Sequence, residues 1–194
     1  MSVEYIITAA AAYLIGSIPN GLILGKLFWH TDLREHGSHN IGATNAWRTL
    51  GKGAGIAVFI ADSLKGQAGV MLGLSLVGTP LAAVVGGLLA IIGHSFSLFL
   101  RFHGGKGVAT SLGVLSMLMG DVTFMLFVLW FTIVYVTRYV SLGSVVAGGL
   151  APILAALFGY PMEYLLFTAI AAVLVIVRHR ENIKRLMNGT ENKI

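Results

Sequence analysis

The chain has no cysteine among its 194 residues. It can therefore form no disulfide, and it carries no thiolate nucleophile. Other familiar signatures are missing as well: the G-x-x-x-x-G-K-[ST] loop, the H-E-x-x-H motif and the G-x-S-x-G nucleophile elbow do not occur. These absences argue against P-loop nucleotide binding, zincin-type metal catalysis and α/β-hydrolase chemistry.

Charge is scarce too. Only 11% of the residues are charged and 56% are hydrophobic, whereas a soluble domain is about 25% charged. We therefore predict an all-α integral membrane protein with a single polytopic domain over residues 1–194. The runs at 108–120 and 122–137 fall short of the roughly 17 residues that a span needs, so they predict a hairpin of short helices or one re-entrant pair. Counted together, seven apolar runs predict seven transmembrane helices, at about 3–25, 54–75, 80–100, 108–120, 122–137, 144–160 and 162–178.

The basic residues are segregated. With seven spans, every Lys and Arg except Lys65 falls in the connections at 26–53, 101–107, 138–143 and 178–194, on one side of the membrane. The other side carries only acidic charges, Glu4, Asp121 and Glu163. The positive-inside rule then predicts an outward N-terminus and a cytoplasmic C-terminus. Polar groups collect at this interface rather than at the midplane. That favours chemistry at the cytoplasmic face over a pore or carrier. The basic residues form no soluble basic face, so nucleic-acid binding is not predicted.

Residues 101–111 place three glycines around Lys106 and follow them with two hydroxyl residues. Glycine lets backbone N–H groups approach an anion and adopts positive φ. If the apolar run resuming at Val108 is helical, its N-terminus adds further positive potential. We therefore predict a phosphate-binding loop at the membrane edge, although a flexible basic loop would explain the short motif taken alone. Its candidate ligands are Gly104, Gly105, Lys106, Gly107 and Thr110.

The first cytoplasmic connection, residues 34–48, is rich in small, hydroxyl and amide residues. Residues 40–50 predict a short interfacial helix with Trp47 at headgroup depth. Ser38 and Asn40 are candidate N-caps of that helix. Arg48 is either a snorkelling side chain or a bidentate phosphate donor.

Ionisable residues in and before the same connection also suggest a metal site. The spacing of its ionisable residues fits no helix face well, so we predict no metal. The residues concerned are His30, Asp32, Glu35, His36 and His39.

Asp62 and Lys65 lie three residues apart inside an apolar run. They predict either a structural ion pair on one helix face or a lysine directed at the site. In the third connection, Ser141 and Ser144 are either helix caps or phosphate contacts. The tail from Arg178 to Glu191 predicts a basic amphipathic helix on the membrane, with His179 and Asn182 on one face.

These segments together resemble the acyl-phosphate:glycerol-3-phosphate acyltransferases, the PlsY family of bacterial membrane enzymes. The family usually has Ser-Gly-Asn in the first loop, where this chain has Ser38-His39-Asn40. A different local backbone is therefore expected there, and His39 is assigned no family role. The matching stretches are Gly16-Ser17-Ile18-Pro19, residues 37–45 with Arg48, Asp62-x-x-Lys65-Gly66, Gly93-His94, residues 104–110, residues 138–144, His179-x-x-Asn182-x-x-Arg185-Leu186, Gly189 and Glu191.

The resemblance implies seven spans with an outward N-terminus and three cytoplasmic motifs that form the site. It implies a bacterial inner-membrane enzyme that makes the first acylation of phospholipid synthesis. The implied reaction transfers a fatty acyl group from acyl phosphate to the sn-1 hydroxyl of glycerol 3-phosphate and gives lysophosphatidic acid and phosphate. The donor is not acyl-CoA, and no cofactor is implied. The H-x-x-x-x-D motif of the other glycerol-phosphate acyltransferase class is absent. The implied partners are both substrates, membrane lipid and a soluble enzyme that makes acyl phosphate.

Two phosphorylated substrates require cationic and N–H donors, and a hydroxyl must lose its proton. Either His179 is the base or a substrate phosphate oxygen takes the proton while His179 and Asn182 position the reactants. A phosphate-ester transporter and a lipid-binding scaffold are the competing interpretations of the charges. The predicted catalytic residues are His179, Asn182, Lys106 and Ser38. The predicted phosphate ligands are Arg48, Gly104, Gly105, Lys106, Gly107, Thr110, Ser141, Ser144, Lys65, Asn40, Asn45 and Glu191.

Overall fold

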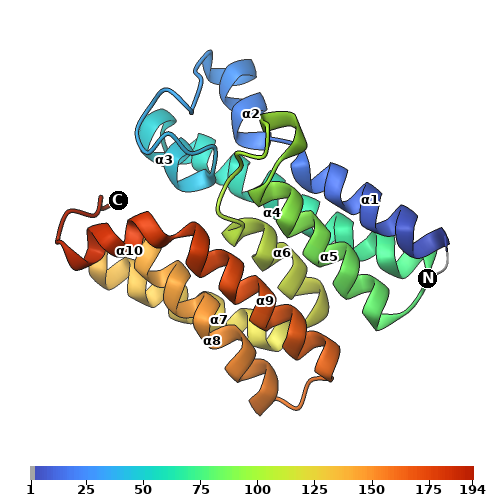
Figure 1. Cartoon of the computed structure of the whole chain (residues 1–194). Helices are drawn as coiled ribbons and strands as arrows, with labels where there is room; N and C mark the ends of the chain where they lie inside the picture. The colour runs from blue at the N-terminus through green and yellow to red at the C-terminus, as the bar shows by residue number, and fades with distance from the viewer. Residues whose placement is uncertain (1–2) are drawn as a thin grey trace. The chain divides into compact units, whose positions relative to one another are not determined.

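The computed structural model describes residues 3–194, and every regular element in that part of the chain is a helix (Figure 1). It divides into two compact units, Met1–Val114 and Leu115–Ile194. The elements in chain order are α1 (Val3–Ser17), α2 (Asn20–Trp29), α3 (Ala43–Leu50), α4 (Lys52–Leu76), α5 (Pro80–Ser95), the short 3-10 helix η1 (Leu98–Leu100), α6 (Val108–Leu118), α7 (Gly120–Thr137), α8 (Val140–Leu157), α9 (Met162–Arg178) and α10 (Arg180–Met187).

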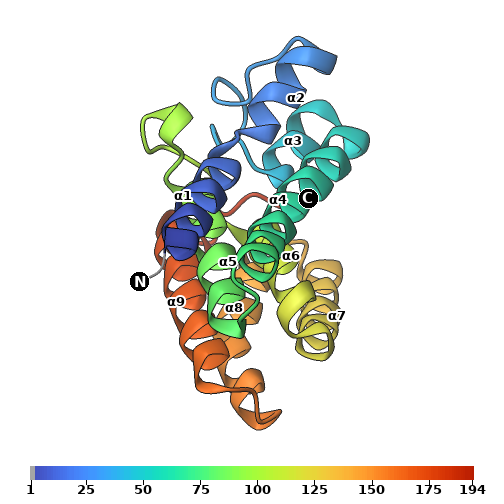
Figure 2. The same ribbon diagram turned by 90° about the vertical axis from the view of Figure 1, so that its right-hand side faces the viewer.

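In the first unit, α1, α4 and α5 lie side by side (Figure 1 and Figure 2). Glycines allow the close approach of α4 and α5: a Cβ on Gly69 would lie against the Gly86 carbonyl, and one on Gly86 against the Gly69 carbonyl. In lipid, such small-residue contacts replace the hydrophobic effect as the source of helix association. The shorter helices α2 and α3 pack on α4.

Replacing Gly86 with alanine should therefore destabilise the first unit. The new methyl meets backbone rather than a movable side chain, and overpacking of this kind typically costs about 1–3 kcal/mol. Thermal unfolding in detergent measures the effect. Gly149→Ala is the matched control, because a Cβ there meets nothing within 4 Å and the substitution should leave the midpoint unchanged or raise it. Equal midpoints for the two variants would contradict the glycine-mediated contact.

In the second unit, α8 packs against both α7 and α9, and α10 folds back onto α8 and α9. The chain bends by 59° between α9 and α10. The C-terminal residues return to the start of α8: the Ile194 N–H donates to the Arg138 carbonyl at 3.0 Å, and Arg138 Nε donates to the Ile194 carbonyl at 2.9 Å. The tail is thereby tied to the segment that opens α8.

The predicted apolar runs correspond to helices, but several bounds were wrong. The run 3–25 is not one helix, because α1 ends at Ser17 and α2 begins after Pro19. The run 144–160 begins too late, since α8 starts at Val140 and takes Ser141 and Gly143 into its first turns. The predicted run 162–178 matches α9. Polar residues that open a helix are easily misread as a loop when their hydrogen-bond partners lie far away in sequence.

The number of spans is a coarser result than the sequence prediction. Within residues 3–194, five helical stretches are long and apolar enough to cross a membrane, or six if α9 and α10 count as one bent span. Between α5 and α7, α6 is apolar but has only 11 residues. The protein is an all-helical integral membrane protein with five to six candidate spans.

Candidate active site

The glycine loop is folded against the end of α5. The N–H of Gly104 donates to the Ser95 carbonyl at 3.2 Å, and the N–H of Gly105 donates to the His94 carbonyl at 3.0 Å. A Cβ on Gly104 would overlap the His94 carbonyl, and one on Gly105 would overlap the His94 imidazole. Gly107 has a φ of +81°, which favours glycine. Each of the three positions thus requires glycine for a structural reason of its own.

The residues that flank the glycine loop include donors suited to an anion. α6 begins at Val108, directly after Gly107, so its N-terminal potential lies beside Lys106. The side chains of Ser95, Thr110 and Ser111 are buried, and their hydroxyls have no hydrogen-bond partner within the described chain. Hydroxyls, a lysine and a helix N-terminus together suit a phosphate group.

A single amide organises the first connection. Asn45 is buried on α3, and its Nδ2 donates to the carbonyls of Leu33, His36 and Asn40 at 2.8–3.0 Å. Its Oδ1 accepts from the N–H of Ser38 at 2.8 Å. Asn45 therefore folds the connection upon itself, a role that its predicted place among the phosphate ligands did not include.

The predicted N-caps of α3 were wrong. Gly42 is the N-cap and supplies no side-chain cap, while Asn40 Oδ1 accepts from the Gly42 N–H at 2.9 Å. Asn40 thus closes a short turn before the helix. Arg48 lies within α3, three residues after Asn45, and is half-buried.

His39 has a φ of +56°, in the left-handed region where glycine is favoured. Histidine is one of the few other residues enriched there. Its Nδ1 lies 2.9 Å from the Arg34 carbonyl, which holds the ring against the connection. The local backbone is therefore one that glycine would adopt without strain.

Asp32, one of two acidic residues between α2 and α3, forms ion pairs with basic neighbours. Asp32 lies 3.0 Å from Lys26 Nζ and 2.6 Å from Arg34 Nη2. Hydrogen bonding from the Arg34 guanidinium holds the pKa of Asp32 well below its usual range. Within residues 3–194, no group of three or more His, Asp or Glu side chains is arranged to hold a metal ion.

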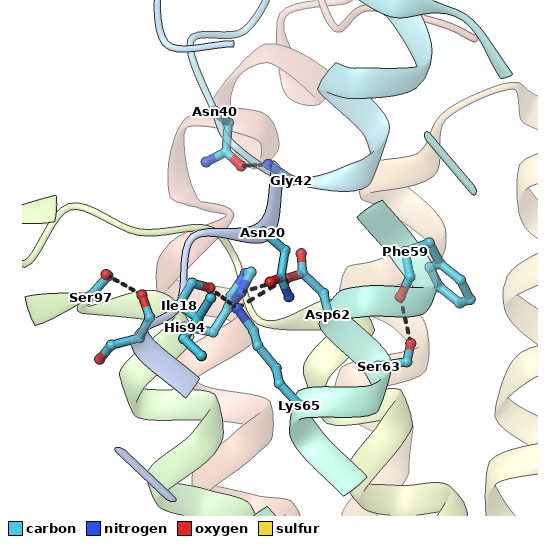
Figure 3. A network of polar contacts seen from close by, with 11 residues as sticks. Ile18, Asn20, Asn40, Gly42, Phe59, Asp62, Ser63, Lys65, His94 and Ser97 are labelled. Atoms are coloured by element: carbon cyan, nitrogen blue, oxygen red, sulfur yellow. Dashed lines mark hydrogen bonds and ion pairs between the residues drawn. The ribbon is translucent and has the colours of Figure 1, made fainter. Parts of the chain in front are cut away.

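A buried charged network in the first unit includes Asp62, Lys65 and His94 (Figure 3). Asp62 Oδ1 accepts from Lys65 Nζ at 3.0 Å and from Asn20 Nδ2 at 3.1 Å. The Lys65 ammonium also donates to the Ile18 carbonyl at 2.9 Å. Lys65 was predicted as a phosphate ligand, but its buried ammonium is directed at these two oxygens. Its position favours the structural ion pair, the other interpretation of this spacing.

The second unit has its own polar cluster, centred on Glu191. Its carboxylate accepts from Ser141 Oγ at 2.9 Å, from Asn182 Nδ2 at 2.7 Å and from Arg185 Nε at 2.7 Å. Three of the predicted site residues, Ser141, Asn182 and Glu191, are therefore brought together. Ser144 lies one turn further along α8, and its hydroxyl donates to the Val140 carbonyl at 2.9 Å and accepts from Trp130 Nε1 at 3.3 Å. Neither serine caps α8, because the N-cap is Tyr139.

His179 occupies the bend between α9 and α10 and is 3% exposed. Its Nδ1 lies 2.7 Å from the Val175 carbonyl. A carbonyl can only accept, so Nδ1 carries the proton and Nε2 of the neutral ring is a hydrogen-bond acceptor. That is the tautomer needed to receive a hydroxyl proton or its hydrogen bond. The pairing follows from the four-residue spacing of 175 and 179 at the helix end, a signal that sequence reasoning missed.

The Glu191 cluster should make the fold sensitive to acid. Burial raises the pKa of Glu191, but hydrogen bonds from Asn182, Arg185 and Ser141 outweigh it, so the pKa of Glu191 in the folded protein lies below the ordinary glutamate value of 4.5. Its stabilisation is therefore complete above pH 4.5 and is lost as the pH falls through the folded-state pKa. Unfolding measured across that range should show a smaller acid-dependent loss for Glu191→Gln than for the parent.

Glu181→Gln is the matched control for this pH experiment. Glu181 lies on the same helix but its side chain is 69% exposed, and an exposed ion pair contributes little. Its pH profile should follow that of the parent. Identical acid profiles for all three proteins would show that the Glu191 hydrogen bonds do not stabilise the fold.

The fold and the two clusters define a class, the polytopic helical membrane proteins with polar sites suited to anions and proton acceptance. The model of the glycerol-3-phosphate acyltransferase family matches residues 6–189. The glycerol-3-phosphate acyltransferase of Carboxydothermus hydrogenoformans is 46% identical over 189 residues, covering 97% of this chain and 96% of its own. Glycerol-3-phosphate acyltransferase 2 of Moorella thermoacetica is 46% identical over 190 residues, covering 98% and 97%.

Two solved structures are also similar. Both are crystal structures of PlsY (YgiH), an integral membrane glycerol 3-phosphate acyltransferase. Its glycerol 3-phosphate form has a TM-score of 0.93 and 39% identity, covering 98% of this chain and 95% of that chain. Its lysophosphatidic acid form has a TM-score of 0.90, 38% identity and the same coverage. The chain belongs to the glycerol-3-phosphate acyltransferase family, as its motifs predicted, and is an integral membrane enzyme.

Proposed function

We propose that the protein transfers a fatty acyl group from acyl phosphate to the sn-1 hydroxyl of glycerol 3-phosphate. The hydroxyl oxygen attacks the acyl carbonyl, the bond from that carbon to the phosphate oxygen breaks, and the hydroxyl proton passes to a base. Lysophosphatidic acid and inorganic phosphate are the products. The glycerol 3-phosphate and lysophosphatidic acid forms of the related PlsY support this substrate and this product.

The observation that carries the acyl-phosphate proposal is the glycine loop with Lys106 at the start of α6. An acyl phosphate is a mixed anhydride whose phosphate is a good leaving group, so no covalent enzyme intermediate is needed. This suits a chain without cysteine or a nucleophile elbow. Lys106, the N-terminus of α6 and the hydroxyl of Thr110 would stabilise charge on a phosphate, while the Gly104 and Gly105 N–H groups hold the loop against α5. Arg48 would add a bidentate donor, and Ser38, Asn40 and Asn45 would keep the first connection folded.

For the second unit we propose that His179 Nε2 accepts a hydrogen bond from the attacking hydroxyl and thereby orients it. A phosphate oxygen of glycerol 3-phosphate then takes the proton, because that substrate supplies its own basic group. Asn182, Ser141 and Glu191 would hold the segment that carries His179, since all three belong to one hydrogen-bonded cluster. Ser144 remains a candidate phosphate contact.

A phosphate-release assay tests the donor. Purified protein in detergent is given glycerol 3-phosphate with acyl phosphate, and in a parallel reaction with acyl-CoA. We expect phosphate and lysophosphatidic acid in equal amounts from the first reaction and no lysophosphatidic acid from the second. Acyl transfer from acyl-CoA at a comparable rate would contradict the proposed donor. Omitting glycerol 3-phosphate controls for spontaneous hydrolysis of the acyl phosphate.

We further propose seven spans with an outward N-terminus in a bacterial inner membrane. The seven would be the five long stretches, the bent α9–α10 pair and the short α6. The segregation of Lys and Arg supports this orientation. A cytoplasmic site would receive acyl phosphate from a soluble enzyme that makes it.

An odd number of spans predicts that the two ends of the chain react from opposite sides of a sealed cell. Because the chain has no native cysteine, single cysteines at Val3 and Lys193, both exposed, serve as labels. A membrane-impermeant thiol reagent should modify Val3→Cys in intact cells and Lys193→Cys only after permeabilisation. Labelling of both from the same side would rule out seven spans.

A further inference from the structure

The network around Asp62 is expensive to bury. Asp62 and Lys65 are 2% and 6% exposed, within an α4 that is long and apolar enough to span a membrane. Desolvating two charges costs about as much as their attraction returns, so such a pair is weak evidence of added stability. Ionisable groups inside spans are instead expected to serve function. The proposed function assigns no role to the Asp62 carboxylate or to the His94 imidazole beside it.

The imidazole of His94 connects the network to the glycine loop. Its Nδ1 lies 3.7 Å from Asp62 Oδ1. Its Nε2 lies where a Cβ on Gly105 would be, so the ring is in direct contact with the loop. The carbonyl of the same histidine accepts the Gly105 N–H at 3.0 Å. One residue, 4% exposed, therefore holds the backbone immediately before Lys106 from two sides.

Helix α4, which carries Asp62, contacts the other end of the loop segment. Gly66, next to Lys65 on α4, lies directly beneath the Thr110 carbonyl, because a Cβ on Gly66 would overlap that oxygen. Asn20, the first residue of α2, is tied to Asp62 at 3.1 Å (Figure 3). The carboxylate thus lies where α2, α4 and α5 meet, and both α4 and α5 contact the segment 104–110.

We propose that Asp62 and His94 are positioning residues of the acyl-transfer reaction. The carboxylate orients the His94 ring, and the ring sets the position of Gly105 and hence of Lys106 towards a bound phosphate. Neither residue touches substrate. The inference rests on the proposed function, because it assumes that the glycine loop binds phosphate.

The first experiment removes the ion pair and the histidine ring separately, without leaving a lone buried charge. Asp62→Asn combined with Lys65→Met removes the ion pair, and His94→Ala removes the ring. Each should lower kcat/KM by at least about tenfold and raise the inhibition constant of inorganic phosphate similarly. With all three changes together the loss should be little greater than with His94→Ala alone, because coupled residues act through one path. Thermal unfolding checks that each variant is folded.

Ser63→Ala is the matched control. It neighbours Asp62 on α4, and its hydroxyl donates to Phe59 of the same helix at 2.8 Å. It should retain the parental kcat/KM and the parental phosphate inhibition constant. Fully additive losses in the combined variant, or an unchanged phosphate inhibition constant in folded His94→Ala, would overturn the proposal.

A second test does not depend on removing the ion pair. Gly105 lies outside the left-handed region, so alanine is allowed by its backbone, but the new methyl would overlap the His94 ring. Gly105→Ala should therefore lower kcat/KM by at least about tenfold in the parent and have little further effect once His94→Ala has opened the space. A further tenfold loss in that background would overturn the role of the ring. A parent protein that releases no phosphate would instead refute the proposed function, whatever the variants do.

Discussion

Lys106→Ala should lower the turnover number by about 100- to 1,000-fold, the usual cost of losing one positioned donor at a developing anion. Lys106 is held between Gly105, which is fixed to His94, and Gly107, whose left-handed backbone opens α6. This rigid setting means that no other part of the loop can bring a replacement charge to the same position. Initial rates of phosphate release with saturating substrates measure the effect.

Lys193→Ala is the control for lost positive charge. Lys193 is exposed near the C-terminus, with its ammonium 5.4 Å from the centre of the Tyr139 ring. A contact of that kind contributes about 0.5–1 kcal/mol at an exposed site, so turnover should stay near that of the parent. Lys106→Arg should recover only part of the rate, because a planar guanidinium does not reproduce a compact ammonium among glycines. Parental turnover in Lys106→Ala would remove the glycine loop from the mechanism.

The helices formed by long apolar runs were predictable from the sequence. Long apolar runs gave α4, α9 and the all-helical class, because lipid forces each backbone group to be satisfied within its own helix. The early start of α8 was missed because its first turn is polar. Ser141 lies in the first turn of α8, and its hydroxyl donates to Glu191, fifty positions later in the chain. A partner at that distance leaves no local pattern.

The site was predictable as a set of residues but not as a set of contacts. Residue type and motif order indicated that Lys106, Ser141, Asn182 and Glu191 matter. They did not reveal that the last three form one cluster, or that Asn45 folds its connection through four hydrogen bonds. These roles depend on which backbone groups remain unpaired after the chain has folded, and every buried one needs a partner.

His179 gives the second large effect, and its substitutions should separate orientation of the hydroxyl from proton abstraction. His179→Ala should lower turnover by about 100-fold, because a misplaced nucleophile costs that much even when the chemistry is intact. His179→Gln should stay within about tenfold of the parent, because its amide oxygen can accept the same hydrogen bond as Nε2. Asn182→Ala, which removes a hydrogen bond to Glu191 at 2.7 Å, should impair turnover as well by loosening the same segment.

The pH dependence of His179→Gln decides which group takes the proton. If the substrate phosphate is the base, the variant should keep an activity limb near the second ionisation of a phosphate monoester, at about pH 6. If imidazole is the base, glutamine cannot replace it, turnover should fall by about 100- to 10,000-fold, and the limb should vanish. The buried ring, with Nδ1 fixed on the Val175 carbonyl, presents an acceptor in either case. We expect the limb to persist, because glycerol 3-phosphate brings its own basic oxygens to the reaction. An inactive His179→Gln that folds and still binds glycerol 3-phosphate would show that the imidazole itself takes the proton.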